Sequence, residues 1–511
     1  MGISLFFILF YNHSFYKHLL HVYPLNGVNN FLYLVSLTLL LFSVIVLLLT
    51  LFSGKRTIKF ILITLLMVSS VSAYFMNCYN IIIDSEMIRN VIETDIKESL
   101  DLFNLKLIVY LFFLGMLPSF YIYTIKIRDE SWRVALFRKI KTILLMVLII
   151  VMVILSFSKF YTSFFREHKP LRYYTNPTYW IYSIGNHIAK TLNSRDTKIE
   201  PIGLDATLIN QDGVPRLVIM VVGEATRADH LSLNGYPRET TPLLKKEKII
   251  NLPHVSSCGT STAHSVPCMF SLYTRDNYSH KKGISTENVL DVLRHTHGIE
   301  ILWRDNNSDS KGVALRVPFE DYTTPKHNPL CDEECRDEGM LVGLDSYIKE
   351  REGREILILL HQKGNHGPAY SKRYTKRFAK FTPACHTNQL EECSTESINN
   401  AYDNALLHTD YFLSEVIQLL KRHEKTYRTT MIYMSDHGES LGEHGIYLHG
   451  MPYFMAPEAQ THVGAFLWLG HNNQKEFDPN QHYSHDNLFH TLLGLFDVQT
   501  EVYNQEMDIF R

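Results

Sequence analysis

Acidic and histidine side chains follow three apolar segments in the second half of this 511-residue chain. Glu224 follows RLVIMVVG (216–223), EILILLHQ (355–362) holds His361 and precedes GNHGP with His366, and TTMIYMSD (429–436) ends in Asp436, followed by His437 and later by His449. Each of these residues alone has a structural explanation, such as capping a helix. Together, carboxylate oxygens and imidazole nitrogens predict a metal site, for which zinc is the best match and manganese the alternative.

The segment SCGTSTAHSVP (257–267) could supply a nucleophile to such a metal. It contains five hydroxyl side chains, Ser257, Thr260, Ser261, Thr262 and Ser265. The residues after Thr262 predict the start of a helix, whose free N–H groups and positive dipole end would favour an anion. A metal also lowers the pKa of a hydroxyl bound to it, which makes that hydroxyl a competent nucleophile at neutral pH. Composition and spacing do not distinguish the five hydroxyls, so the nucleophile stays open at this point.

The elements that must position these residues are strands and helices in alternation. The three apolar segments are typical of buried parallel strands, and helical stretches such as 397–422 lie between them. This order predicts an α/β domain with a mainly parallel sheet. Sites in such sheets form at the carboxyl ends of the strands, so we expect the acidic and histidine residues to converge there.

The first 160 residues have a different character. Four uncharged apolar runs cover residues 31–52, 60–83, 107–124 and 142–158. Roughly 20 apolar residues in a helix cross a bilayer core of about 30 Å, so we predict four membrane spans. Residues 3–10 are apolar but too short to cross alone, and we interpret them as the end of a shortened first span. The sequence therefore predicts five spans, with the first one incomplete or unusually short.

Basic residues and cysteines predict the orientation. Lys55, Arg56 and Lys59 follow the 31–52 run, and six Lys and Arg residues between 126 and 141, including Arg128, follow the 107–124 run. Both loops should be cytoplasmic, which places residues 161–511 outside the cytoplasm. Six of the seven cysteines lie in that part as sequence neighbours, and their clustering suggests the disulfides Cys258–Cys268, Cys331–Cys335 and Cys385–Cys393. The alternative, a zinc-binding cysteine set, lacks the C-x2-C spacing.

The chain as a whole therefore divides into three parts. Residues 1–160 form a transmembrane domain, residues 161–214 mix aromatic and basic side chains, and residues 215–511 form the soluble domain. The middle part suits an amphipathic segment at the membrane surface, although a plain linker explains it nearly as well. The net charge of −2 gives no case for a nucleic-acid partner.

Several long motifs resemble a known family. GEATRADHLSLNGY, SCGTSTAHSVPCMFS, WRDNNSDSKGV, HQKGNHGPAYSKRY, NAYDNALLHTD and SDHGESLGEHGIYLHGMPY are similar to the signature segments of lipid A phosphoethanolamine transferases, most closely of the mobile colistin-resistance type. The resemblance covers nearly the whole chain, including IDSEMIRNVIETD (83–95) in an outer loop. It implies an alkaline-phosphatase-like α/β/α fold, shared with sulfatases, for the soluble domain.

The resemblance also implies roles for particular residues. It implies zinc held by Glu224, Thr262, Asp436 and His437, with Thr262 as the nucleophile. It assigns His366 and His449 to a second zinc or to the substrate phosphate, with a role in proton donation. Positions implicated in headgroup recognition match Ser308 and Lys311, and positions near the ethanolamine match Asn90 and Glu98. The three neighbour disulfides match the family as well.

The implied reaction moves phosphoethanolamine from phosphatidylethanolamine to a phosphate of lipid A through a phosphoethanolamine-threonine ester. The implied protein is a monomer in the inner membrane of a Gram-negative bacterium, with a periplasmic catalytic domain, and it would confer resistance to polymyxin, colistin and other cationic peptides. The alternative is a phosphoethanolamine or phosphoglycerol transferase for another envelope acceptor. A sulfatase is disfavoured because the C-x-P-x-R type of motif is absent. A non-catalytic scaffold is disfavoured because all four implied ligands are present.

Two histidines depart from the family pattern. His444 stands where relatives often carry Asn, and His264 occupies a variable position beside Thr262. We expect both to be bystanders and not additional metal ligands.

Overall fold

The computed structural model describes residues 1–54, 57–93, 96–127, 130–192, 198–209, 213–471, 477–478 and 481–510. The chain forms two compact units. The first comprises Met1–Ile88 and Phe103–Ala189, and the second comprises Arg89–Leu102 and Lys190–Arg511. The short segment 89–102 therefore belongs to the same unit as the soluble domain, although it lies between two apolar helices in the sequence.

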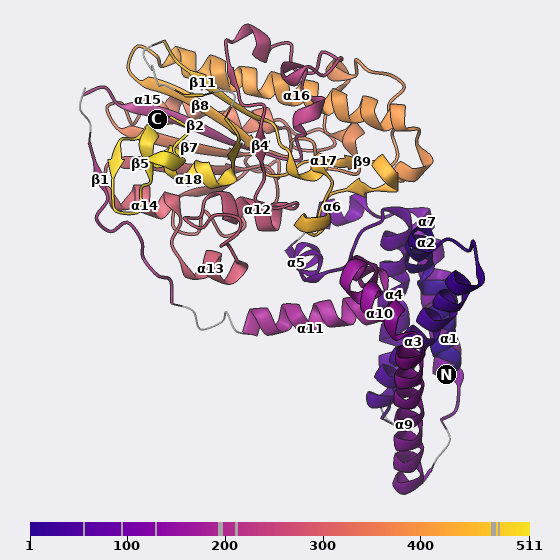
Figure 1. The fold of residues 1–511 in the computed structure, drawn as a ribbon. Helices are drawn as coiled ribbons and strands as arrows, with labels where there is room; N and C mark the ends of the chain where they lie inside the picture. The colour runs from indigo at the N-terminus through magenta and orange to yellow at the C-terminus, as the bar shows by residue number, and fades with distance from the viewer. Residues whose placement is uncertain are drawn as a thin grey trace. The chain divides into compact units, whose positions relative to one another are not determined.

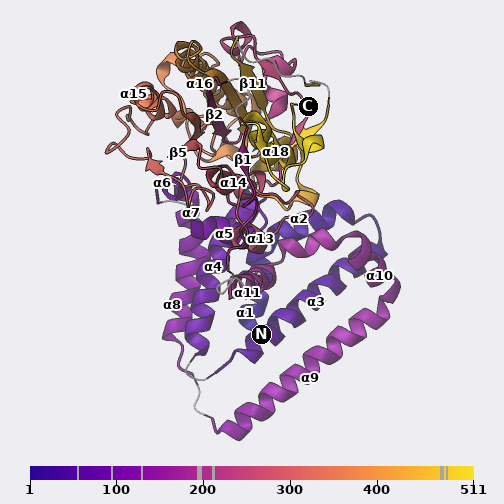
Figure 2. The ribbon, with the colours of Figure 1, turned by 90° about the vertical axis from the view of Figure 1, so that its left-hand side faces the viewer.

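Four helices of the first unit are long and apolar enough to cross a membrane. They are α3 (Val28–Leu51), α4 (Ile58–Cys78), the continuous stretch of α7 (Leu105–Tyr110), η1 (Leu111–Met116, a π-helical turn) and α8 (Leu117–Thr124), and α9 (Trp132–Ser156). A rise of about 1.5 Å per residue gives helices of this length a span close to the bilayer core. Helices α3 and α9 lie side by side (Figure 2). A long apolar helix is therefore present at each of the four predicted spans.

The ends of two spans differ from the predicted ends. Helix α4 ends at Cys78 and does not continue to residue 83, because Asn80 adopts a left-handed backbone (φ 59°) that terminates a helix. Helix α9 begins at Trp132, ten residues before the apolar run, because Lys and Arg are good helix formers. An apolar run marks the part of a helix that suits lipid, and the helix itself can be longer.

Shorter helices begin and end the first unit. Helix α1 (Gly2–Tyr11) is apolar but has only ten residues, so the fifth span stays a prediction. It is followed by α2 (His13–Val22), and the C-terminal part of the unit contains α10 (Ser158–Glu167), η2 (Lys169–Tyr174) and α11 (Thr178–Leu192). Membrane-surface binding of this last part stays a prediction too, and so does the orientation, for which Lys55, Arg56 and Arg128 lie outside the described residues.

A seven-stranded sheet forms the centre of the second unit. The strand order is β3 (Ile250–Asn251), β11 (Ala465–Leu469), β8 (Arg428–Ser435), β2 (Arg216–Gly223), β7 (Glu355–His361), β5 (Ile299–Asp305) and β6 (Phe319–Asp321). The five strands from β8 to β6 are parallel, whereas β11 pairs antiparallel with β8 and with β3. The predicted strands correspond to β2, β7 and β8, and their parallel pairing is confirmed.

Helices cover both faces of this sheet (Figure 1). Helix α16 (Thr395–Arg422) lies over one face, and α12 (Thr262–Met269), α14 (Val289–His295) and α18 (Leu488–Leu495) lie over the other. Alternate side chains of β2, such as Val218 and Met220, pack into the core with these last three helices, as the period of two in a strand requires. The arrangement is the predicted three-layer α/β/α fold.

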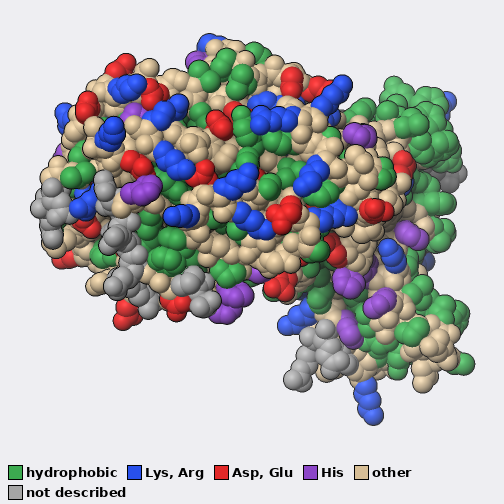
Figure 3. All heavy atoms as spheres, turned by 90° about the horizontal axis from the view of Figure 1, so that it is seen from above, with side chains coloured by type: hydrophobic (Ala, Val, Ile, Leu, Met, Phe, Trp, Pro, Cys, Tyr) green, Lys and Arg blue, Asp and Glu red, His purple; other side chains and the backbone are tan. Residues whose placement is uncertain are grey.

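Smaller elements complete the second unit, and the first of them, α5, begins in the first unit. They are α5 (Ser85–Glu93), α6 (Ile96–Asp101), α13 (His280–Ser285), α15 (Leu344–Lys349) and α17 (Glu458–Thr461), together with the two-stranded pairs β1 (Thr207–Leu208) and β13 (Val498–Gln499), β4 (Val255–Ser256) and β12 (Tyr483–Ser484), and β9 (Ser440–Leu441) and β10 (Tyr447–Leu448). The face of this unit visible in Figure 3 carries Lys and Arg side chains interspersed with Asp and Glu.

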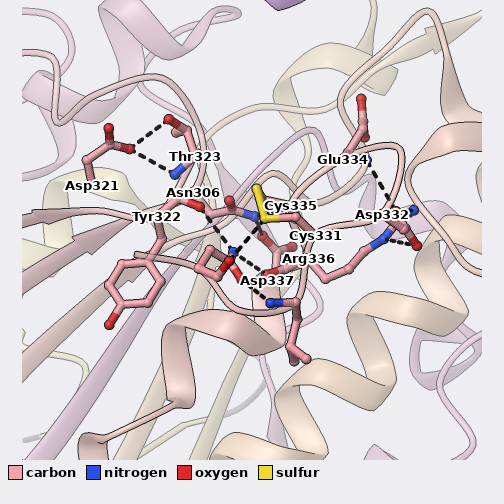
Figure 4. Close-up of a disulfide and its surroundings, with 12 residues drawn as sticks. Asn306, Asp321, Tyr322, Thr323, Cys331, Asp332, Glu334, Cys335, Arg336 and Asp337 are labelled. Carbon is pink, nitrogen blue, oxygen red and sulfur yellow. Dashed lines mark hydrogen bonds and ion pairs between the residues drawn. A yellow bond between two sulfur atoms is a disulfide. The ribbon is translucent and has the colours of Figure 1, made fainter. Parts of the chain in front are cut away.

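Three disulfides brace the loops of the second unit. They join Cys258 to Cys268, Cys331 to Cys335 and Cys385 to Cys393, which are the pairs predicted from the clustering of the cysteines. Figure 4 shows the second of them beside the carboxyl end of β5. There the Asn306 amide donates to the main-chain oxygen of Cys335 (2.9 Å) and to Asp337 (2.8 Å), so the disulfide loop is held against the strand end.

Candidate metal centre

Four of the predicted site residues lie together at the carboxyl edge of the sheet. Glu224 directly follows β2, Asp436 and His437 directly follow β8, and Thr262 is the first residue of α12. All four are buried. Because β2 and β8 are neighbouring parallel strands, their ends meet at one edge, and the N-terminus of α12 points its first residue at the same place.

The distances among these side chains suit a small metal ion. Thr262 Oγ1 lies 3.1 Å from Glu224 Oε2 and 3.3 Å from His437 Nε2. His437 Nε2 lies 3.3 Å from Glu224 Oε1 and 3.4 Å from Asp436 Oδ2. A tetrahedral ion with ligands at about 2.0 Å has edges of about 3.3 Å between those ligands. These four distances therefore match the edges of a tetrahedral metal site.

The other hydrogen bonds of these side chains leave one nitrogen lone pair and two carboxylate oxygens available to bind a cation. The Nδ1 of His437 lies 2.8 Å from the main-chain oxygen of Gly438, which fixes the proton on Nδ1 and leaves a lone pair on Nε2. Asp436 Oδ1 accepts from the main-chain N–H groups of Ala225 (3.2 Å) and His437 (2.7 Å). Glu224 Oε1 and Asp436 Oδ2 are buried and accept no hydrogen bond. Such buried oxygens are costly unless a cation or a donor satisfies them.

Charge at this edge shifts the pKa values of the two carboxyl groups in opposite directions. Burial alone would raise the pKa of Glu224, but the neighbouring His437, His366 and His449 hold it well below its ordinary value. Burial and the charge of Glu224 raise the pKa of Asp436. Two carboxylates this close repel each other when both are ionised, and a bound cation would remove that repulsion.

Thr262 differs from the other hydroxyls of its segment. Ser257, Thr260 and Ser265 donate to the main-chain oxygens of Gly259, Met451 and Asp436, at 2.6, 2.6 and 2.5 Å. Thr262 donates instead to the Glu224 carboxylate. The predicted helix start at Thr262 is confirmed. The structure therefore distinguishes Thr262 from Ser257, Thr260 and Ser265, which composition could not do.

His366 and His449 lie beside this cluster. The His449 ring centroid is 4.2 Å from that of His437 and 5.5 Å from that of His366. His449 Nδ1 contacts Glu439 Oε2 at 2.7 Å, and the other Glu439 oxygen accepts from the Tyr370 hydroxyl at 2.7 Å. Burial alone would lower the pKa of His449, but Glu439 raises it to about 9. Glu439 thus keeps His449 protonated at neutral pH and turns its Nε2 away from the carboxylate.

Two groups of three donors could hold a metal ion among the described residues. One is Glu224, Asp436 and His437, and the other is His437, Glu439 and His449. In each group the donor atoms lie within 4.8 Å of one another. In the second group, however, the Glu439 oxygens already contact Tyr370 and His449, so the first group offers the better donors.

Asn307 is a site residue that the strand pattern did not reveal. It follows β5, and its Nδ2 donates to Glu224 Oε2 at 2.8 Å. Its Oδ1 accepts from Ser308 Oγ at 3.0 Å, which connects one predicted headgroup residue to the Glu224 carboxylate. The signal was the fourth strand end, 299–305, whose polar continuation DNNSDS follows the same rule as the other three. Glu439 was also missed, although it directly follows the SDHG segment.

The other predicted residues lie at different distances from the centre. Lys311 Nζ contacts the main-chain oxygen of Glu93 at 3.4 Å, so it connects the loop that follows β5 with the segment 89–102. Asn90 lies on α5 in that segment. Glu98 lies on α6, and its side chain is outside the described residues. Their roles in binding stay predictions.

Three further histidines of the second unit differ in their burial and contacts. His361 is fully buried at the end of β7 and contacts Asp305 at 2.8 Å through Nδ1. His264 packs its ring edge-on against Tyr278 with centroids 5.3 Å apart. His444 is exposed and has a left-handed backbone (φ 54°). Neither His264 nor His444 belongs to the two donor groups found among the described residues.

Two buried histidines, one on α18 and one just before it, should make the stability of this unit depend on pH. Burial lowers the pKa of His485 and of His490 to about 4, whereas an exposed histidine titrates near 6.5. Below pH 6.5 the unfolded chain binds protons at these positions that the folded chain does not bind. Each residue therefore lowers the free energy of unfolding by up to about 3 kcal/mol as the pH falls from 6.5 to 4. The apparent unfolding temperature should fall over this range.

Two histidine variants distinguish this effect on stability from the effect of carboxyl groups that titrate in the same pH range. His490→Gln should show a shallower decline between pH 6.5 and 4 in a thermal melt, whereas replacing the exposed His471 by Gln should leave the decline unchanged. Equal slopes for His490→Gln and the unchanged chain would show that His490 is not the neutral buried group described above.

Comparisons with known proteins agree with this architecture. Residues 216–498 match the sulfatase family model, and residues 41–192 match the model described as phosphoethanolamine transferase EptA/EptB. The chain is 43% identical to the phosphatidylethanolamine transferase Mcr-2 of Escherichia coli, over 97% of this chain and 94% of that protein. It is 40% identical to the phosphoethanolamine transferase EptA of Escherichia coli, over 98% and 94%.

A solved structure matches the whole chain. It is the integral membrane lipooligosaccharide phosphoethanolamine transferase A of Neisseria meningitidis, with a TM-score of 0.94 and 32% sequence identity. The match covers 100% of this chain and 97% of that one. Both the apolar helices and the α/β/α unit are therefore shared with a complete membrane protein, so the chain is a membrane protein with a soluble periplasmic domain.

Proposed function

Because this chain belongs to the phosphoethanolamine transferase family, we propose that it transfers phosphoethanolamine from phosphatidylethanolamine to a phosphate of lipid A, with Thr262 as the nucleophile. The observation that carries the proposal is the cluster of Thr262, Glu224, Asp436 and His437. The Thr262 hydroxyl lies 3.1 Å from Glu224 Oε2 and 3.3 Å from His437 Nε2, so it lies among the proposed metal ligands, as suits an activated nucleophile in phosphoryl transfer through a covalent intermediate.

Zinc is the ion that best suits these donors. Two carboxylates, one imidazole and one hydroxyl form a small, mixed oxygen and nitrogen set with tetrahedral spacing. When bound there, zinc would lower the pKa of the Thr262 hydroxyl and stabilise negative charge on the phosphoryl oxygens. The group of His437, Glu439 and His449 is the candidate for a second ion.

In the first step, Thr262 Oγ1 attacks the phosphorus of the donor lipid, and the bond from phosphorus to the diacylglycerol oxygen breaks. The Thr262 proton is directed at Glu224 Oε2, its hydrogen-bond acceptor. The departing diacylglycerol oxygen needs a proton, and we assign its donation to His449, whose protonated form is favoured by the contact with Glu439. The products are diacylglycerol and a phosphoethanolamine ester on Thr262.

In the second step, a phosphate oxygen of lipid A attacks the same phosphorus. The bond from phosphorus to Thr262 Oγ1 breaks, and Thr262 recovers its proton from Glu224. The N–H groups at the start of α12 face the phosphoryl group throughout and favour its negative charge. His449 regains its proton from solvent, and the site returns to its initial state.

The membrane helices agree with the proposed lipid substrates. Donor and acceptor are membrane lipids, so a transferase gains from being anchored where they are concentrated. We propose the inner membrane of a Gram-negative bacterium as the location. A single chain is the proposed working unit, because every side chain of the site comes from one chain. Adding an ethanolamine cation to lipid A would weaken the binding of polymyxin, colistin and other cationic peptides.

A mass spectrum of lipid A tests this function. Lipid A from cells that express the chain should contain a species heavier by one phosphoethanolamine group, and cells that express Thr262→Ala should lack it. His444→Asn, at an exposed position outside the metal cluster, serves as a variant that should retain the modification. Unmodified lipid A together with phosphoethanolamine on another envelope component would assign a different acceptor and contradict the lipid A assignment.

A further inference from the structure

Arg373 is a buried cation that contacts the backbone of a residue of the candidate site. Its side chain is 0% exposed, and its Nε donates to the main-chain oxygen of His366 at 2.6 Å. Its Nη2 pairs with Asp101 at 3.1 Å, and its Nη1 pairs with Glu334. The guanidinium therefore uses three separate nitrogens for three partners, and one of these partners is the backbone of a site histidine.

The first carboxylate, Glu334, lies inside the loop closed by the Cys331–Cys335 disulfide (Figure 4). This loop is held to the strand end through Asn306, which donates to Cys335 and to Asp337. Asp337 also accepts from the main-chain N–H groups of Lys363 (2.8 Å) and Gly364 (3.1 Å), in the segment that leads to His366. Glu334 is thus fixed on a rigid loop beside the His366 segment.

The second carboxylate, Asp101, comes from the segment 89–102 between two apolar helices. Besides Arg373, it pairs with Lys372, and its main-chain oxygen accepts from the Asn388 amide. Burial alone would raise the pKa of Asp101, but Arg373 and Lys372 hold it below its ordinary value, so the carboxylate is ionised at neutral pH. The contact is therefore a charge pair that connects this segment to the residues flanking the site.

We infer that Arg373 positions His366 for the transfer reaction, and that Asp101 transmits the placement of the segment 89–102 to the site through Arg373. A buried guanidinium is stable only while its carboxylate partners remain, and its planar geometry then sets the direction of every N–H. The direction of Nε–H in turn fixes the main-chain oxygen of His366, whose ring packs edge-on to that of His449. The inference rests on the proposed function.

The alternative is that Arg373 is only a structural brace. If Arg373 were only a brace, its substitution would lower the free energy of unfolding. The effect of that substitution on turnover would then not depend on the identity of residue 366. A positioning residue acts through His366, so its effect on turnover should vanish once the imidazole is gone. The two cases therefore differ in a double-mutant cycle and not in a single variant.

The cycle uses the full-length protein in vesicles with a fluorescent phosphatidylethanolamine donor and lipid A as the acceptor. Arg373→Lys should lower kcat by about 10- to 100-fold, with KM changed by less than about threefold, as for other residues that orient an active-site group. In a His366→Gln background, the same substitution should change kcat by less than about twofold. Asp101→Asn, which keeps the shape of the side chain, should show the same pattern with a smaller loss and guards against misfolding of Arg373→Lys.

Arg216 provides a matched control. It is also a buried arginine with two carboxylate partners, Glu355 (2.9 Å) and Asp497, but it lies at the first residue of β2, at the opposite edge of the sheet. Arg216→Lys should lower the unfolding temperature about as much as Arg373→Lys and leave kcat within about twofold.

The possible results separate the inference from the proposed function. Non-additive losses for Arg373 and His366, with normal turnover for Arg216→Lys, support the positioning role. Additive losses, or full activity of both Arg373→Lys and Asp101→Asn, overturn it while the proposed function stands. A wild-type protein that transfers no phosphoethanolamine overturns the proposed function and this inference with it.

Discussion

Thr262→Ala should lower phosphoethanolamine transfer by roughly 1000-fold or more, because it removes the proposed nucleophile, whose oxygen would form the covalent bond to phosphorus. Thr262 is the hydroxyl of its segment that donates to a Glu224 oxygen and not to a main-chain carbonyl. The loss corresponds to at least about 4 kcal/mol of transition-state stabilisation. The measurement is the initial rate of diacylglycerol release from phosphatidylethanolamine by the purified, full-length variant.

Two neighbouring variants make this result specific. Ser261→Ala changes the adjacent residue, whose side chain makes no capping hydrogen bond to α12, and should keep activity within a few-fold of the unchanged chain. Thr262→Ser keeps a hydroxyl and should retain measurable transfer. Comparable rates for Thr262→Ala and Ser261→Ala would mean that another group attacks the phosphorus.

Asp436→Asn should remove the metal and with it the activity. Asp436 Oδ2 is a buried oxygen that accepts no hydrogen bond, and it lies 3.4 Å from His437 Nε2. Replacing the carboxylate by an amide deletes a charged ligand, and a loss of more than about 100-fold in metal affinity is expected. Elemental analysis of protein purified without chelator should give about one zinc ion per chain for the unchanged protein and almost none for the variant.

Asp410→Asn is the matched control for this experiment. Asp410 is an equally buried carboxylate on α16, but it accepts from the main-chain N–H groups of Leu243 and Leu244, both at 2.9 Å. This variant should keep its zinc. The unfolding temperature should also drop after chelation in the unchanged protein and in Asp410→Asn, because bound metal stabilises the folded state by mass action. Retention of zinc and full turnover by Asp436→Asn would refute the ligand assignment.

The elements of the catalytic unit that can be predicted from sequence are those with a local signal. RLVIMVVG is uniformly apolar with a polar residue after it, and it forms β2 with the predicted bounds. The start of α12 at Thr262 follows from the change from Ser- and Gly-rich sequence to a helical stretch. Because neighbouring parallel strands end at one edge, the convergence of Glu224, Asp436 and His437 follows from the strand pattern itself.

The parts that could not be predicted depend on contacts between residues far apart in the chain. Asn307 contacts Glu224 across 83 positions, and Arg373 contacts Asp101 across 272, so no spacing rule connects them. The choice of Thr262 from residues alone also failed, because it depends on where the other hydroxyls find main-chain acceptors. The early start of α9 was missed because its first turns are basic, and hydropathy shows only the apolar part of a helix.

The covalent state of Thr262 is the most direct test of the account. The full-length protein is mixed with phosphatidylethanolamine in the absence of lipid A and then digested, and its peptides are analysed by mass spectrometry. We expect one phosphoethanolamine group on Thr262, which disappears when lipid A is added. A phosphoethanolamine group on Ser257, Thr260, Ser261 or Ser265, or turnover without any modified peptide, would contradict it.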